Sequence, residues 1–127
     1  MELNLIARTI NYYPVNLVKP DKLETLLLGY LFEFQMSGYY KDSFLIYNYK
    51  KQGCYLTYYE GLDSDDKQQS QLGCKSKFIS LTYPTGDKKD FLYQVEIINI
   101  LSQNFHGYVY DPKNKKVISA SEAKFLY

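Results

Sequence analysis

The chain has 127 residues, with 15 Lys plus Arg against 14 Asp plus Glu, so it carries almost no net charge. Hydrophobic residues make up 46% and charged residues 23%, which is typical of a globular protein and not of a disordered or membrane-spanning one. A chain of this length buries enough surface to fold as one unit, so we expect a single domain over residues 1–127.

The residue types that carry most catalysis and phosphate recognition are scarce. The sequence holds one Arg, one His (His106), two Cys and no Trp, beside 15 Tyr and 7 Phe. Because Arg reads phosphate and guanine in bidentate geometry, and no basic half of the chain exists, a nucleic-acid partner is disfavoured. Neither a glycine-rich phosphate loop nor a G-x-S-x-G motif is present, and Cys54 and Cys74 form no metal-ligand pattern with His106. We expect a non-enzymatic protein without metal or cofactor, in which His106 interacts with carbonyls at a helix end.

Two features bear on the cellular compartment. The N-terminus lacks a basic segment followed by an apolar one, and no apolar run approaches 18 residues. We therefore expect a cytosolic protein with no membrane partner. Cys54 and Cys74 are then expected to be reduced thiols, with a disulfide across the intervening loop as the alternative.

The chain begins with a predicted strand and a predicted helix. Residues 2–10 alternate loosely and lead to a turn before Pro14, as a strand does. A helix is expected to start at Pro20, where Asp21 followed by Glu24 resembles a capping box.

The end of this helix can be placed in two ways. Gly29 closes it and a strand follows over residues 31–36, or the helix continues to Gly38. We favour the short helix. In that interpretation three apolar side chains share one face of the strand: Phe32, Phe34 and Met36.

The middle of the chain predicts a hairpin, a loop and a further strand. Residues 44–50 and 54–60 flank a three-residue connection ending in Gly, and the first of these strands is apolar or aromatic on both faces. Residues 62–75 show no periodic apolar pattern and are expected to form a long exposed loop. Residues 77–83 alternate and predict a strand.

The clearest helix follows, with Asp87 as its cap and Asp90 in its first turn. Its expected apolar stripe consists of Phe91, Val95, Ile98, Leu101 and Phe105, widened by Leu92, Ile97 and Ile100. Residues 108–110 and 116–119 then predict a hairpin around an Asp-Pro turn, and Ser119 or Ser121 caps a final helical turn. This order predicts an α+β domain, with a mainly antiparallel sheet and two principal helices packed on one face.

Residues 60–66 place four carboxylates within seven positions. The order of residues in a calcium loop is absent, which leaves a solvated loop or an electrostatic recognition loop. In the second interpretation, clustered acids beside tyrosines cover a basic site on another protein, because tyrosines bury a large area at low entropic cost. The candidate partner-binding residues are Tyr55, Tyr58, Tyr59, Glu60, Asp63, Asp65 and Asp66.

Neighbouring tyrosines support an interaction surface. In an extended chain, the two rings of Tyr12-Tyr13, Tyr39-Tyr40 and Tyr58-Tyr59 point to opposite faces. Each buried hydroxyl also needs a hydrogen-bond partner, so some of these rings are expected to meet solvent or another protein.

Residues 78–119 carry a family resemblance. They comprise a strand ending in Thr82-Tyr83-Pro84, an apolar helix ending in Asn104-Phe105-His106-Gly107, and the tract Tyr108-Val109-Tyr110-Asp111-Pro112 with a return strand through Val117-Ile118. This arrangement resembles small bacterial immunity proteins, which neutralise polymorphic toxins of contact-dependent inhibition or type VI secretion. The resemblance implies a cytosolic, non-enzymatic protein that binds one cognate toxin and occludes its active site or an exosite. It assigns no functional residue.

Two hypotheses of function follow. In the first, the acidic and aromatic surface around residues 60–66 engages a basic, nuclease-like toxin. The alternative is a small-ligand-binding or regulatory α+β domain. Its pocket is expected between helix and sheet, lined by Tyr47, Tyr49, Tyr83 and Tyr108.

Overall fold

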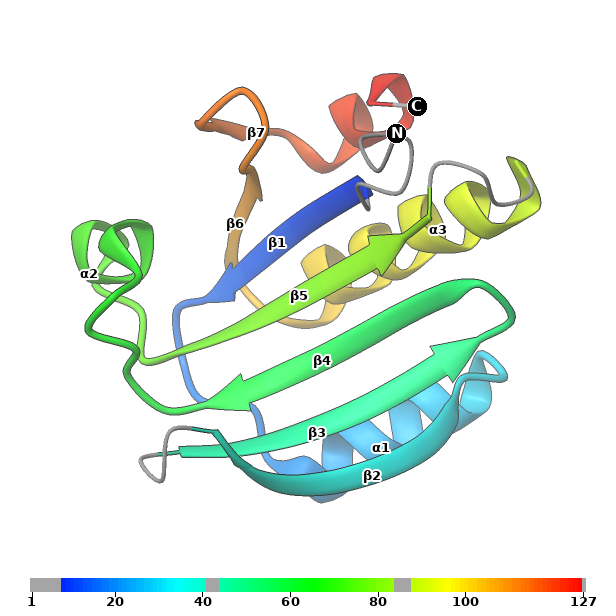
Figure 1. The fold of residues 1–127 in the computed structure, drawn as a ribbon, viewed down its shortest axis with the longest axis horizontal. Helices are drawn as coiled ribbons and strands as arrows, with labels where there is room; N and C mark the ends of the chain where they lie inside the picture. The colour runs from blue at the N-terminus through cyan, green and yellow to red at the C-terminus, as the bar shows by residue number, and fades with distance from the viewer. Residues whose placement is uncertain (1–7, 41–43, 84–87, 127) are drawn as a thin grey trace, which may run out of the picture.

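The frame of the molecule is one seven-stranded sheet with the strand order β2-β3-β4-β5-β1-β6-β7, in which the neighbours pair antiparallel (Figure 1). The computed structural model describes residues 8–40, 44–83 and 88–126. The strands are β1 (Arg8–Pro14), β2 (Glu33–Tyr40), β3 (Phe44–Lys51), β4 (Cys54–Glu60), β5 (Ser76–Thr82), β6 (Gly107–Asp111) and β7 (Lys116–Ile118). The helices are α1 (Pro20–Gly29), α2 (Lys67–Leu72), α3 (Lys88–Asn104) and the 3₁₀ helix η2 (Ala120–Phe125). The predicted α+β class is confirmed.

The main core lies between one face of the sheet and the helices α1 and α3. Alternate strand residues point into it, and they form one buried cluster with leucines and isoleucines of both helices. In Figure 1 both helices lie behind the strands. We call this side the covered face; its largest strand side chains include Ile10, Tyr12, Leu56, Tyr58 and Phe78.

Helix α3 departs from its predicted apolar stripe in two places. Leu92 is 51% exposed, whereas Gln94 is fully buried. The Gln94 amide is satisfied, because its nitrogen donates to Ser80 at 3.1 Å and its oxygen accepts from the Thr82 hydroxyl at 3.1 Å. These hydrogen bonds offset the cost of burying a polar side chain in the core. The expected cap at Asp87 lies outside the described residues.

The first strand and helix differ in detail from the prediction. Strand β1 continues through Pro14, which lies opposite Gly107 of β6, instead of ending before it. The capping box is wrong: the N-cap position is Lys19, Pro20 occupies the first turn, and the Asp21 carboxylate accepts from the neighbouring backbone N–H of Lys22 at 3.0 Å. Proline suits this position because the first helical N–H has no partner within the helix.

The short form of α1 is confirmed, since it ends at Gly29 and β2 starts at Glu33. A bulge then interrupts the register of β2, where Phe34 pairs with Tyr49 but Met36 pairs with Asn48. The bulge turns Met36 to the sheet face opposite Phe34. The expectation that Phe32, Phe34 and Met36 share one face is therefore wrong.

Both predicted hairpins are present. Lys51 pairs with Cys54, so the β3–β4 turn has two residues and not three, and Gln52 adopts a left-handed φ of 52° in it. In the β6–β7 turn the Asp111 side chain accepts from the backbone N–H of Lys113 at 3.0 Å. Near the C-terminus, Ser119 is the cap, as its backbone N–H donates to Glu122 at 2.9 Å.

Candidate functional site

The segment after β4, expected to be a long exposed loop, contains the short helix α2. The Asp66 side chain caps it by accepting from the backbone N–H of Gln69 at 3.0 Å, and Gly73 ends it with a left-handed φ of 69°. Gln69 is fully buried, and its side chain donates to the Gly61 carbonyl at 2.8 Å. The prediction of a loop was wrong because a six-residue helix held by polar contacts produces no apolar periodicity.

Segment 61–75 covers part of the sheet face opposite α1 and α3. Tyr12 and Tyr13 point to opposite faces as expected, yet both are only 1% exposed. The ring of Tyr13 is covered because a second buried cluster forms around it, consisting of Tyr13, Cys74 and Tyr110, with Leu72 packed against them. Both cysteines are free and buried.

An ion cluster fastens this segment to β5. The Lys77 ammonium lies 3.1 Å from an oxygen of Asp63 and 2.9 Å from an oxygen of Asp66, and the Tyr13 hydroxyl donates to Asp66 at 3.0 Å. Burial alone would raise the pKa of Asp66, but hydrogen bonds from Lys77, Gln69 and Tyr13, with the lysine's charge, lower it. Burial alone would lower the pKa of Lys77, but the two carboxylates raise it. Lys77 and Asp66 therefore both stay charged at neutral pH.

The ion cluster changes the role of the candidate partner-binding residues. Asp63 is 8% exposed and bound to Lys77, and Tyr58 is 0% exposed, with its hydroxyl accepting from the backbone N–H of Val18 at 3.0 Å. The expectation that Tyr58 and Asp63 belong to an exposed surface is therefore wrong. Of the remaining candidates, Asp65 is exposed, and four are partly buried: Tyr55, Tyr59, Glu60 and Asp66.

On the sheet face opposite α1 and α3, no other described part of the chain covers strands β2 to β5 (Figure 1). The exception is the end of the strands near α2. We call this the open face. Its side chains, placed by the strand register, are Met36, Ile46, Asn48, Tyr55, Thr57, Tyr59, Ile79, Leu81 and Tyr83. Met36 is 61% and Tyr83 48% exposed, which gives the face an accessible apolar and aromatic character.

Aromatic contacts organise one end of the open face. The rings of Tyr55 and Tyr83 meet edge to face with centroids 6.1 Å apart, and the Lys50 ammonium lies 5.6 Å from the Tyr55 ring. At the other end, Lys77 lies 5.2 Å from the Tyr59 ring. The sequence predicted Tyr55 and Tyr59 as partner-binding residues, assigned Tyr83 to the ligand pocket instead, and gave no role to Ile46, Ile79 and Leu81. These residues could have been predicted from the sequence, because residues 44–50 and 77–83 are apolar on both faces. With helices on one face of the sheet only, the other face is left with exposed apolar side chains.

The pocket expected for a small ligand is not formed by its four predicted tyrosines. Tyr47 and Tyr49 point to the covered face, where Tyr47 stacks on Tyr58 and Tyr49 is 2% exposed. Tyr83 and Tyr108 point to the opposite face. Sheet alternation separates the two pairs.

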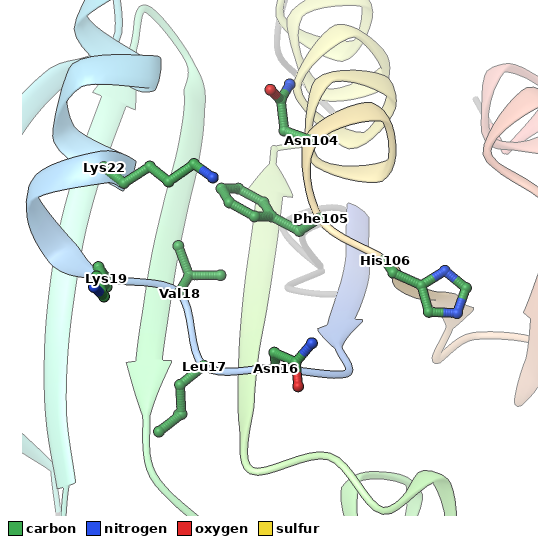
Figure 2. A pocket seen from close by; sticks show the side chains of 8 residues that line it. All are labelled: Asn16, Leu17, Val18, Lys19, Lys22, Asn104, Phe105 and His106. Carbon is green, nitrogen blue, oxygen red and sulfur yellow. The ribbon is translucent and has the colours of Figure 1, made fainter.

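His106 lies on the connection from α3 to β6, where its backbone carbonyl accepts from the Val15 N–H at 2.8 Å. Its exposed ring lines one edge of a pocket and points away from Phe105 and Lys22 (Figure 2). Within residues 8–40, 44–83 and 88–126, no group of three or more His, Cys, Asp or Glu side chains is arranged to hold a metal ion. No helix among these residues combines the length and apolar character needed to cross a membrane.

Comparison of the chain with protein-family models, with curated proteins and with solved structures finds no match.

Proposed function

We propose that this chain is a cytosolic, non-enzymatic immunity-type protein that binds a cognate toxin through the open face. The observation that carries the proposal is an aromatic and aliphatic sheet surface backed by one continuous buried core. Four strands of seven or eight residues span about 19 Å by about 23 Å, or about 440 Å² in projection. Within this area the most exposed apolar side chains are those of Met36 and Tyr83, and contiguous exposed apolar patches on monomers are often functional.

The composition of the open face suits protein recognition. Tyrosines at protein interfaces combine a large apolar ring with a hydroxyl that forms hydrogen bonds, and they are enriched among the residues that dominate binding energy. Tyr55 and Tyr83 support each other edge to face, so their rings are partly ordered before a partner arrives. The strands behind them are held by α1 and α3 through one continuous core.

The acidic residues contribute less to the proposed binding than the aromatic side chains of the open face do. Asp63 and Asp66 are bound to Lys77, and the partly buried Glu60 lies on the covered face beside Tyr47. The exposed Asp65 is therefore the acidic candidate that would attract a basic toxin at the rim of the open face. Charges at an interface rim raise the association rate more than they raise affinity. A nuclease-like toxin with a basic surface fits this arrangement.

The test is co-expression with the product of the adjacent upstream gene, followed by growth measurement and purification of the complex. The wild-type chain should protect the cell and form a stable complex. Tyr83→Arg should weaken binding by about 2 kcal/mol, roughly 30-fold, if the open face is the interface. Asp65→Lys should slow association, and the effect should shrink at high salt.

The chain supplies a matched control for this experiment. Tyr30 is 41% exposed against 48% for Tyr83, but it lies at the end of α1 on the covered side. Tyr30→Arg therefore places the same charge at a similar exposure away from the open face and should leave binding unchanged. The proposal would be refuted if the two variants bound equally well, or if the wild-type chain formed no complex with the upstream gene product.

A further inference from the structure

A pocket of about 390 Å³ lies where two connections meet (Figure 2). One wall is the connection from β1 to α1 together with the first turn of α1, and the other is the connection from α3 to β6. Its volume falls within the range of small-molecule sites in proteins, which is about 300–1,000 Å³. The lining residues are Asn16, Leu17, Val18, Lys19, Lys22, Asn104, Phe105 and His106.

Buried tyrosines hold both walls in place. The Tyr58 hydroxyl accepts from the Val18 N–H at 3.0 Å, and the Tyr12 hydroxyl donates to the Phe105 carbonyl. Burial, with a smaller contribution from Cys74, raises the pKa of Tyr12 to about 12, so its hydroxyl keeps the proton that it donates. These bonds give the pocket its shape before any ligand binds, which lowers the cost of binding.

The lining of the pocket is cationic. Lys19 and Lys22 are exposed, and no ion pair links either ammonium to a carboxylate of the described residues. The nearby Asp21 carboxylate accepts from the backbone of Lys22 and is absent from the lining. Two positive charges without an acidic neighbour in the pocket favour a dianion over a neutral ligand.

An aromatic ring, that of Phe105, lies beside the Lys22 ammonium. Phe105 is partly buried, packs on the core and stacks with Phe78 at a centroid distance of 6.4 Å and an interplanar angle of 15°. In Figure 2 the Lys22 side chain extends towards the Phe105 ring, and its ammonium lies 5.6 Å from the ring centroid. Val18 adds an apolar surface to the same wall. The pocket therefore joins a cationic and an apolar aromatic region.

We propose that this pocket binds a small phosphate monoester that carries a planar aromatic group. The phosphate dianion pairs with Lys19 and Lys22, and the aromatic group packs against Phe105 and Val18. Asn16 adds a hydrogen-bonding amide at the edge of the pocket. The proposal is independent of the open face, which lies on the other side of the sheet.

The probe for the test is phenyl phosphate, titrated into the ¹⁵N-labelled full chain and followed by amide chemical shifts. Saturable shifts should be confined to the pocket walls, residues 16–22 and 104–107. Inorganic phosphate carries only the anionic group of the probe, and phenol carries only its aromatic ring. Each should therefore bind at least about tenfold more weakly than phenyl phosphate. No saturable shift, shifts spread over other surfaces, or phosphate binding as tightly as phenyl phosphate would overturn the proposal.

A pair of double variants separates this site from general charge attraction. Lys19→Gln with Lys22→Gln removes two exposed ion pairs to the phosphate and should weaken binding about tenfold. Lys113→Gln with Lys116→Gln removes the same charge at the exposed end of the β6–β7 hairpin and should leave the affinity within twofold. Equal losses in the two variants, or no loss in the first, would contradict the assignment.

Discussion

Replacing Lys77 by Met tests whether the ion cluster, and not hydrophobic packing alone, fastens segment 61–75. The lysine is 5% exposed and contacts Asp63 and Asp66 at 3.1 and 2.9 Å. With an effective dielectric constant of about 20, two unit charges about 4 Å apart attract by about 4 kcal/mol, so the variant loses about 8 kcal/mol of attraction. Removing the buried ammonium recovers several kcal/mol of desolvation cost. We expect a net destabilisation of about 3 kcal/mol at pH 7.

The pH dependence has a defined sign. The pKa of Asp66 is lowered in the folded state, so its contribution is present above about pH 4 and is lost as the pH falls through the folded value. The pKa of Lys77 is raised, so its contribution is present up to about pH 10 and is lost as the pH rises further. In Lys77→Met the carboxylates that have lost the lysine's charge protonate more readily, and the destabilisation at pH 4 should fall to about half of its pH 7 value or less.

Urea unfolding followed by circular dichroism at 222 nm measures both quantities, provided that the m value is unchanged. Lys75→Met is the matched control, because Lys75 is exposed and its loss should cost no more than about 0.5 kcal/mol. Adding Asp63→Asn and Asp66→Asn to Lys77→Met should restore most of the stability, since Asn also caps helices. A destabilisation below about 1 kcal/mol for Lys77→Met at pH 7, or one independent of pH, would refute the reasoning.

Three further predictions concern buried contacts. Gly107→Ala should destabilise by more than about 2 kcal/mol in urea unfolding, because a Cβ there would overlap the Tyr13 carbonyl, whereas Gly38→Ala, with open space around it, should have little effect. Tyr58→Phe leaves the backbone N–H that leads into α1 without its acceptor and should cost about 1–3 kcal/mol in the same assay. Burial, with a smaller contribution from Asp90, raises the pKa of Cys54 to about 12, so its thiol should resist Ellman's reagent until the chain unfolds; fast reaction of the native chain would contradict this.

The sequence predicted most of the fold because its longer elements carry strong local signals. Periodic apolar residues located α3, turn residues located both hairpins, and Gly29 marked the end of α1. The errors lie where tertiary contacts override these signals. Gln94 is buried because Ser80 and Thr82 satisfy its amide, and no periodicity of hydrophobic residues reveals such a partner.

The candidate site was only partly predictable for the same reason. The alternation of residues 54–60 places Tyr55 and Tyr59 on one face and Tyr58 on the other, but it does not say which face the helices cover. The acidic cluster was visible in the sequence, whereas its partner Lys77 lies 11 and 14 positions further on, in the next strand. A charge pattern along the chain cannot show which carboxylates a distant lysine will neutralise.

The ion cluster also decides how recognition by this protein should be tested. Reversing the charge of Asp63 or Asp66 would place two cations together in a buried site, and reversal at Asp66 would also remove the cap of α2. A loss of binding in either variant would therefore report unfolding of segment 61–75. Asp65 is exposed, and its reversal changes the charge at the rim while Asp66 remains in place as the cap of α2. Asp65→Lys therefore tests electrostatic steering, and Tyr83→Arg tests the open face. If Asp65→Lys alone slows association while only Tyr83→Arg speeds dissociation, charge guides the partner and the aromatic face holds it.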